Sequence, residues 1–134
     1  MAKKQLTSKR VRTITIQKTA NGFETKTGLY SKTHLKIKNQ IRRIAALPQY
    51  GTHYIGATEG LDKRWSNYGD WEFKHVLYET TSYETAKEAE ADLIRYTSTR
   101  YPSCNKDPLS RGLRLGAARY YIYILADDTC KVRV

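Results

Sequence analysis

The amino-acid sequence predicts an α+β fold, a small and mostly antiparallel β-sheet flanked by helices, with a basic hairpin and helix at its N-terminal end. Stretches rich in β-branched and aromatic residues occur at 53–55, 71–79 and 118–125, and each is typical of a strand. Two longer stretches, 31–47 and 82–101, repeat apolar residues at helical spacing. A chain of 134 residues can bury one modest core. We therefore expect a single domain over 1–134, with a basic part at 1–48 and a core at 49–134.

The positive charge is concentrated in the first part of the chain. The net charge is +11, and residues 1–58 hold 12 Lys and Arg against a single acid, whereas residues 59–134 are balanced. Such an asymmetry favours a polyanionic partner, with nucleic acid as the first candidate, over a merely solubilising surface. Two cysteines and three scattered histidines exclude a disulfide framework and zinc-ligand spacing. With no apolar run of membrane-spanning length, we expect a cytoplasmic protein without a membrane partner.

The basic part is expected to form a hairpin and a helix. Asn21-Gly22 is a strong hairpin signal, with strands expected at 11–18 and 23–27. Ser31 or Thr33 can cap the helix that runs to residue 47 before Pro48. One face of this helix is basic and is expected to follow a DNA backbone, the alternative being an ordinary solvated face. Its residues are Lys32, Lys36, Lys38, Arg42 and Arg43.

The core begins with a strand at 53–55, which we expect to break at Gly56, followed by a short helix from about Gly60. After the strand at 71–79, Ser82 is expected to cap the helix that ends before Pro102. The strand at 118–125 precedes a turn and a short last strand at 130–134. The apolar stripe of the second long helix comprises Ala86, Ala89, Leu93, Ile94 and Thr97.

Two charged residues are expected on inward-facing sides of helices. Helical spacing places Arg64 on one side with Leu61, Trp65 and Tyr68, and an inward guanidinium usually needs an anionic partner. Glu90 falls on the apolar stripe described above. A buried carboxylate is costly unless it is paired or binds a metal, and helix geometry alone makes an ion pair with Arg and a metal site equally plausible.

The order of these residues resembles that of the GIY-YIG nuclease family. Tyr54-Ile55-Gly56 is followed by Arg64 ten residues after the tyrosine, and by an aromatic residue, Tyr68, four residues further on. Glu90 and, about fifteen residues later, Asn105 complete the pattern across roughly residues 50–112. The resemblance implies a metal-dependent DNA endonuclease of the phage or mobile-element type, which acts in the cytoplasm of the host cell if it is phage-encoded.

The resemblance also implies a role for each residue. Glu90 would hold one divalent cation, Mg²⁺ or Mn²⁺, and Arg64 would pair with the scissile phosphate. Tyr54 and Tyr68 would position or deprotonate the attacking water, and Asn105 would hold the phosphate or the glutamate in register. Further DNA contacts are expected from Lys63, Arg111 and Arg114.

One part of the family pattern is displaced. No tyrosine strand directly precedes Tyr54, and two tyrosines are candidates for the missing phenol. Chain order favours Tyr30. Strand character favours Tyr123, which would mean that the family's first strand has moved to the chain end and pairs beside Tyr54. If neither acts, the chain is a catalytically degenerate nucleic-acid-binding protein.

A third interpretation of the sequence is a structural or inhibitory protein that binds an acidic protein. The sequence contains no separate specificity domain, so we expect loose sequence preference, or help from a homodimer or a partner protein.

Overall fold

The structure, a computed structural model, describes residues 18–105 and 113–131, and within them it contains a three-stranded antiparallel sheet. The strands are β1 (Thr52–Thr58), β2 (Phe73–Thr80) and β3 (Tyr120–Asp127). The last strand in the sequence is the middle one in space, because the order is β1-β3-β2. The predicted α+β fold is therefore confirmed.

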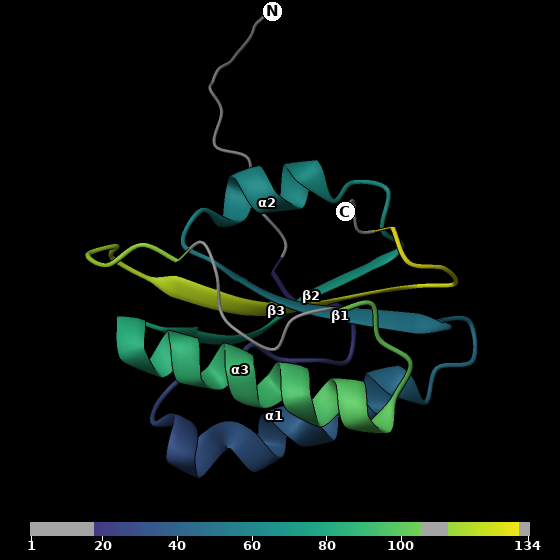
Figure 1. Cartoon of the computed structure of the whole chain (residues 1–134), viewed down its shortest axis with the longest axis horizontal. Helices are drawn as coiled ribbons and strands as arrows, with labels where there is room; N and C mark the ends of the chain where they lie inside the picture. Colours follow the sequence, from purple (N-terminus) through teal and green to yellow (C-terminus); the bar gives the residue numbers. More distant parts are fainter. Residues whose placement is uncertain (1–17, 106–112, 132–134) are drawn as a thin grey trace, which may run out of the picture.

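Helices cover the sheet unequally (Figure 1). The long helices α1 (Tyr30–Ala45) and α3 (Tyr83–Arg100) lie together on one face, while the short helix α2 (Leu61–Asn67) lies on the other. We call these the α1/α3 face and the α2 face. Each face has its own cluster of buried side chains.

The main hydrophobic core lies between the sheet and the two long helices. Ile37, Ile41 and Ile44 of α1 are fully buried in the same cluster as Leu93 of α3 and Ile122 of β3. The basic helix is thus part of this core.

The start of α3 agrees with the sequence prediction, whereas the start of α1 does not. The Ser82 hydroxyl accepts a hydrogen bond from Thr85 N at 3.1 Å, and the predicted apolar stripe of α3 is buried together with Glu90. Helix α1 begins at Tyr30, with the apolar Leu29 in the capping position. The prediction of Ser31 or Thr33 as the cap was wrong, because both lie inside the helix, where the Thr33 hydroxyl donates to Leu29 O at 2.8 Å.

The segment before α1 follows β2 instead of forming the predicted return strand. Residues 21–22 do turn, with Gly22 at φ 85°, but residues 23–27 contribute only one isolated bridge, from Lys26 to Tyr78. The Lys18 carbonyl accepts a hydrogen bond from Val76 N at 2.8 Å. Residues 11–17 lie outside the described residues, as do 132–134 of the predicted last strand, whereas 130 and 131 are not in a strand.

Candidate functional site

Three tyrosines from three elements converge on the α2 face. Tyr54 lies on β1. Tyr123 lies on β3, directly opposite Gly56 of β1, and Tyr68 is the C-cap residue of α2. Their ring centroids are 5.8 to 6.5 Å apart. The Tyr123 hydroxyl donates to the Tyr68 hydroxyl at 3.3 Å. The expected pairing of the Tyr123 strand beside Tyr54 is present.

Gly56 makes room for the Tyr123 ring. The expected break at this residue was wrong, because β1 continues through it to Thr58. A Cβ atom on Gly56 would lie 2.8 Å from Tyr123 Cε1 and closer still to other atoms of the phenol. The glycine is therefore required by a close approach of the ring across the strand pair, not by a turn.

Arg64 reaches the tyrosines from α2. Its Nη1 atom lies 3.5 Å from the Tyr68 hydroxyl, and the side chain is partly buried. Burial lowers the pKa of this guanidinium, but the phenols of Tyr123, Tyr68 and Tyr54 outweigh burial, and the net shift of the pKa is upward. The side chain is therefore a fixed positive charge beside three hydroxyl groups.

Tyr54 and Tyr123 are held in their protonated form. Burial raises the pKa of Tyr54 to about 12, with further contributions from Tyr68 and Glu90 that Arg64 partly offsets. Burial likewise raises the pKa of Tyr123 well above its ordinary value, because the residue is only 1% exposed. Neutral phenols can donate and accept hydrogen bonds, so at neutral pH this cluster is suited to orienting a water molecule or a phosphate oxygen.

Glu90 lies on α3, on the opposite face of the sheet, and its negative charge acts on Tyr54 across the edge strand β1. It is 6% exposed on the stripe of α3 that packs against the sheet, and its charge contributes to the raised pKa of Tyr54. No group of three or more His, Cys, Asp or Glu side chains that could hold a metal occurs among residues 18–105 and 113–131. A single buried carboxylate nevertheless fits Mg²⁺, which keeps several waters and commonly takes one or two protein carboxylates together with substrate phosphate oxygens.

Asn105 fixes the backbone of β1 next to Tyr54. Its Oδ1 accepts from Ile55 N and its Nδ2 donates to Ile55 O, both at 2.8 Å. The preceding residues run parallel to β1, with His53 N donating to Pro102 O and Cys104 N donating to His53 O. Asn105 thus bonds to both backbone polar groups of the buried Ile55 and holds β1 in place beside Tyr54.

Tyr30, the other candidate for the missing phenol, lies elsewhere. Its hydroxyl donates to Asp92 Oδ2 at 2.7 Å, and its ring packs against Tyr78 and His34 on the α1/α3 face. The sheet therefore separates Tyr30 from Tyr54, and the structure brings Tyr123 alone of the two candidates to the cluster.

The cations expected to contact DNA are dispersed. Lys63 is exposed on α2, next to Arg64, and Arg114 is exposed after the gap in the described residues, in which Arg111 lies. The five basic residues of α1 are on the opposite face of the sheet (Figure 1). Lys38 forms an ion pair with Asp92 at 2.9 Å, Arg42 contacts Asn39, and Arg43 donates to Gly22 O at 2.8 Å; Lys32 and Lys36 are exposed.

Sequence reasoning missed several neighbours of the cluster. The Trp65 ring packs edge-on against Tyr123, with centroids 5.3 Å apart, a contact that helical spacing does not predict. Tyr121 shares the α2 face with Tyr123, as strict alternation along β3 could have indicated. Lys18 and Arg119 both contact Glu79. These residues are far apart in the sequence, so no local pattern predicts the contacts.

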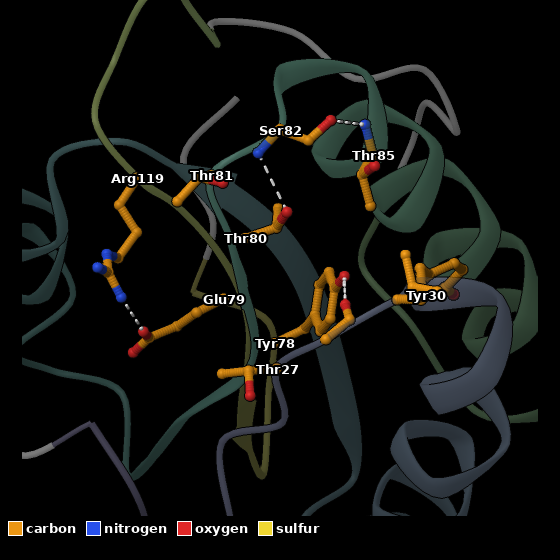
Figure 2. A pocket seen from close by; sticks show the side chains of 11 residues that line it. Thr27, Tyr30, Tyr78, Glu79, Thr80, Thr81, Ser82, Thr85 and Arg119 are labelled. Carbon is orange, nitrogen blue, oxygen red and sulfur yellow. Dashed lines mark hydrogen bonds and ion pairs between the residues drawn. The ribbon is translucent and has the colours of Figure 1, made fainter.

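A hollow of about 470 Å³ lies at the end of β2, lined by residues other than those of the tyrosine cluster (Figure 2). Its polar side chains largely bond within the fold: Tyr78 donates to Gly28 O, Thr80 accepts from Ser82 N, and Ser82 accepts from Thr85 N. Arg119 and Glu79 face each other at its margin.

Comparison of the chain with models of protein families, with curated proteins and with solved structures found no match. Across the described parts of the chain, no helix is long and apolar enough to cross a membrane.

Proposed function

We propose that the protein is a metal-dependent DNA endonuclease of the GIY-YIG type, in which the strand at the end of the chain takes the place of the family's first strand. The observation that supports this most strongly is the pairing of β3 with β1, which sets Tyr123 beside Tyr54. Arg64 and Tyr68 join them from α2, and Glu90 lies within electrostatic reach of Tyr54. The proximity of these residues, which come from distant parts of the sequence, supports the proposal.

The chemistry of the site follows from the charge and protonation of its groups. Arg64 binds a non-bridging oxygen of the scissile phosphate, and its planar guanidinium can use two donors at once, which a lysine cannot do. Tyr54, Tyr68 and Tyr123 hold the attacking water by hydrogen bonds. A phenol can take the proton of that water only after it has released its own proton to solvent, and positive charge favours this release by lowering the pKa of the phenol, as Arg64 already does for Tyr54.

The carboxylate of Glu90 would hold one Mg²⁺ or Mn²⁺ ion. When bound, such an ion supplies positive charge that stabilises the phosphate and the leaving 3′ oxygen. Burial of Glu90 keeps the carboxylate in one place, and Asn105 keeps the adjoining strand in register through Ile55.

A second function has one observation in its favour. Tyr123 is 1% exposed and burial holds its phenol in the neutral form, and both properties are typical of a tyrosine that packs in a core. A chain that keeps this scaffold only to bind nucleic acid, without cleavage, is the alternative.

Cleavage of supercoiled plasmid in Mg²⁺ or Mn²⁺ tests the proposal. Wild type should cut, while Glu90→Gln and Arg64→Ala should lose at least about 100-fold in rate, because each removes a charge that acts on the phosphate. Matched controls are Glu88→Gln, an exposed residue on the same helix, and Arg95→Ala, an exposed arginine; both should cut at close to the wild-type rate.

DNA binding in EDTA, measured in parallel by fluorescence anisotropy, separates the two functions. Loss of cutting with binding retained in the two site variants supports the nuclease. A wild-type protein that binds DNA but does not cut in either metal supports the alternative, and cutting that survives Glu90→Gln contradicts the assignment of the metal ligand.

A further inference from the structure

The α2 face extends beyond the tyrosine cluster. Across the sheet, one row of paired residues is Gly56, Tyr123 and Val76, and the next row on the same face is Thr58, Tyr121 and Glu79. Two residues along a strand span about 7 Å. A nucleic-acid strand that contacts the tyrosine cluster can therefore reach the neighbouring row.

In that neighbouring row, one carboxylate contacts two cationic side chains. The Glu79 side chain is 7% exposed and contacts Lys18 Nζ through Oε1 and Arg119 Nη1 through Oε2, the latter at 3.2 Å. The two cations come from opposite ends of the chain, and Figure 2 shows Arg119 reaching toward the carboxylate. Since the carboxylate neutralises one of two positive charges, the group retains a net charge of +1.

The cations remain accessible although the carboxylate is buried. The side chain of Lys18 is 42% exposed and that of Arg119 is 54% exposed. An ammonium has three N–H donors and a guanidinium has five, so one contact with Glu79 leaves each with donors for another acceptor. The buried carboxylate fixes where these donors lie, which reduces the entropy lost when an anion binds.

An aromatic ring lies between this group and the catalytic cluster. Tyr121 is only partly buried, and Lys18 Nζ lies 5.9 Å from its ring centroid. A ring beside a phosphate-binding cation is the arrangement that binds single-stranded nucleic acids, in which bases stack on aromatic side chains while cations hold the backbone.

We propose that Tyr121, Lys18 and Arg119 form a nucleotide subsite, in which Tyr121 stacks on a base of a DNA strand and the two cations bind a phosphate next to the scissile one. The subsite rests on the proposed function for its position relative to the scissile phosphate, but its binding can be measured without cleavage. It gives the protein a preference for DNA with an unpaired base beside the cut, because a paired base cannot reach the ring.

The test is the affinity of the full-length protein for fluorescein-labelled oligothymidine in EDTA, over a series of salt concentrations. The double variant Lys18→Ala/Arg119→Ala should bind about 10-fold more weakly, and its salt dependence should decrease by about 1 to 2 in slope. The control Lys87→Ala/Arg95→Ala removes the same charge from exposed positions of α3 and should bind within about 2-fold of wild type. Because Glu79 loses both partners in the double variant, Arg119→Ala alone, which keeps Lys18, serves as a second variant and should show part of the effect.

Stacking is tested separately with Tyr121→Leu. This variant should bind oligothymidine about 10-fold more weakly, yet it should bind an abasic oligomer of the same length as well as wild type does. If the two double variants lost the same affinity for oligothymidine, the effect would be one of general charge, and the proposal would be overturned. A Tyr121→Leu variant with unchanged affinity, or competition by polyglutamate as effective as that by DNA, would also overturn it.

The outcomes distinguish the subsite from the nuclease. If wild type never cleaves but the variants weaken binding as stated, the subsite stands and the nuclease fails. If wild type cleaves but the variants bind normally, the nuclease stands and the subsite fails.

Discussion

The two faces of the sheet are built on different principles. On the α1/α3 face, helices of 16 and 18 residues bury an apolar core that includes Ile41 and Leu93. On the α2 face, a helix of only 7 residues leaves part of the strands open and packs aromatic and charged side chains together. The comparison shows that the large core holds most of the buried apolar side chains, whereas the smaller cluster packs the Tyr68 and Tyr123 hydroxyls and Arg64 among aromatic rings.

The polar residues on the two faces also differ in the groups to which they bond. On the α1/α3 face, His75 accepts a hydrogen bond from Ala20 N through Nδ1, and its Nε2 lies 3.1 Å from both Glu24 O and Gln40 Oε1. These contacts fasten the segment before α1 to β2. On the α2 face, by contrast, the Tyr68 hydroxyl accepts hydrogen bonds from both the Tyr123 hydroxyl and Arg64 Nη1.

The largest expected effect on stability comes from truncating a side chain in the α1/α3 core. Leu93→Ala should lower the free energy of unfolding by about 2 to 5 kcal/mol, because the residue is fully buried and its truncation leaves a cavity. Leu35→Ala, the same substitution at a 71% exposed position of α1, should change it by less than about 0.5 kcal/mol. Urea denaturation measures both. Similar losses in the two variants would contradict the placement of the core.

Protonation of His75 should weaken the same face. Burial lowers the pKa of His75 from 6.5 to about 4. Between these values the unfolded chain binds the proton and the folded chain does not, so stability should fall by about 3 kcal/mol as the pH is lowered from 6.5 to 4. His75→Gln removes this titration, and its unfolding free energy should depend less on pH over that interval. An identical pH dependence for the two proteins in denaturant titrations would contradict the buried neutral imidazole.

On the α2 face, the expected effects on stability are smaller and act through the tyrosines. Gly56→Ala should cost about 1 to 3 kcal/mol, because the added methyl group overlaps the Tyr123 ring. Gly60→Ala is the control, since among the described residues no atom lies within 4 Å of a Cβ built there. In a Tyr123→Ala background the cost of Gly56→Ala should decrease, and a double-mutant cycle of thermal unfolding measures that coupling. Strict additivity would refute the contact.

The predictability of these two faces from sequence also differs. The stripe of α3 and its Ser82 cap were predicted correctly, because helical spacing and capping are local properties. The role of Gly56 was not, because it depends on a ring that lies 67 positions later in the sequence and becomes its neighbour only when β3 pairs with β1. The start of α1 was misplaced because Ser31 and Thr33 are good capping residues by type, yet Tyr30 is drawn into the helix by its packing in the core.

The candidate site was predictable as a set of residues but not as an arrangement. Spacing singled out Tyr54, Arg64, Glu90 and Asn105, whereas the choice between Tyr30 and Tyr123 depended on the order of strands in the sheet. Strand order is a non-local property, which the periodicity of a single strand does not contain. The Lys18–Glu79–Arg119 group was missed for the same reason.

The most direct test of the account compares two substitutions that each remove one hydroxyl group. Tyr123→Phe and Tyr30→Phe are made in otherwise unchanged protein, and the rate of plasmid cleavage in Mg²⁺ is measured for each. The account predicts a loss of at least about 100-fold for Tyr123→Phe, whose hydroxyl lies in the cluster, and a rate within about 3-fold of wild type for Tyr30→Phe, whose hydroxyl binds Asp92 on the other face. Cleavage that survives Tyr123→Phe but fails in Tyr30→Phe would place the chemistry on the α1/α3 face and contradict the account.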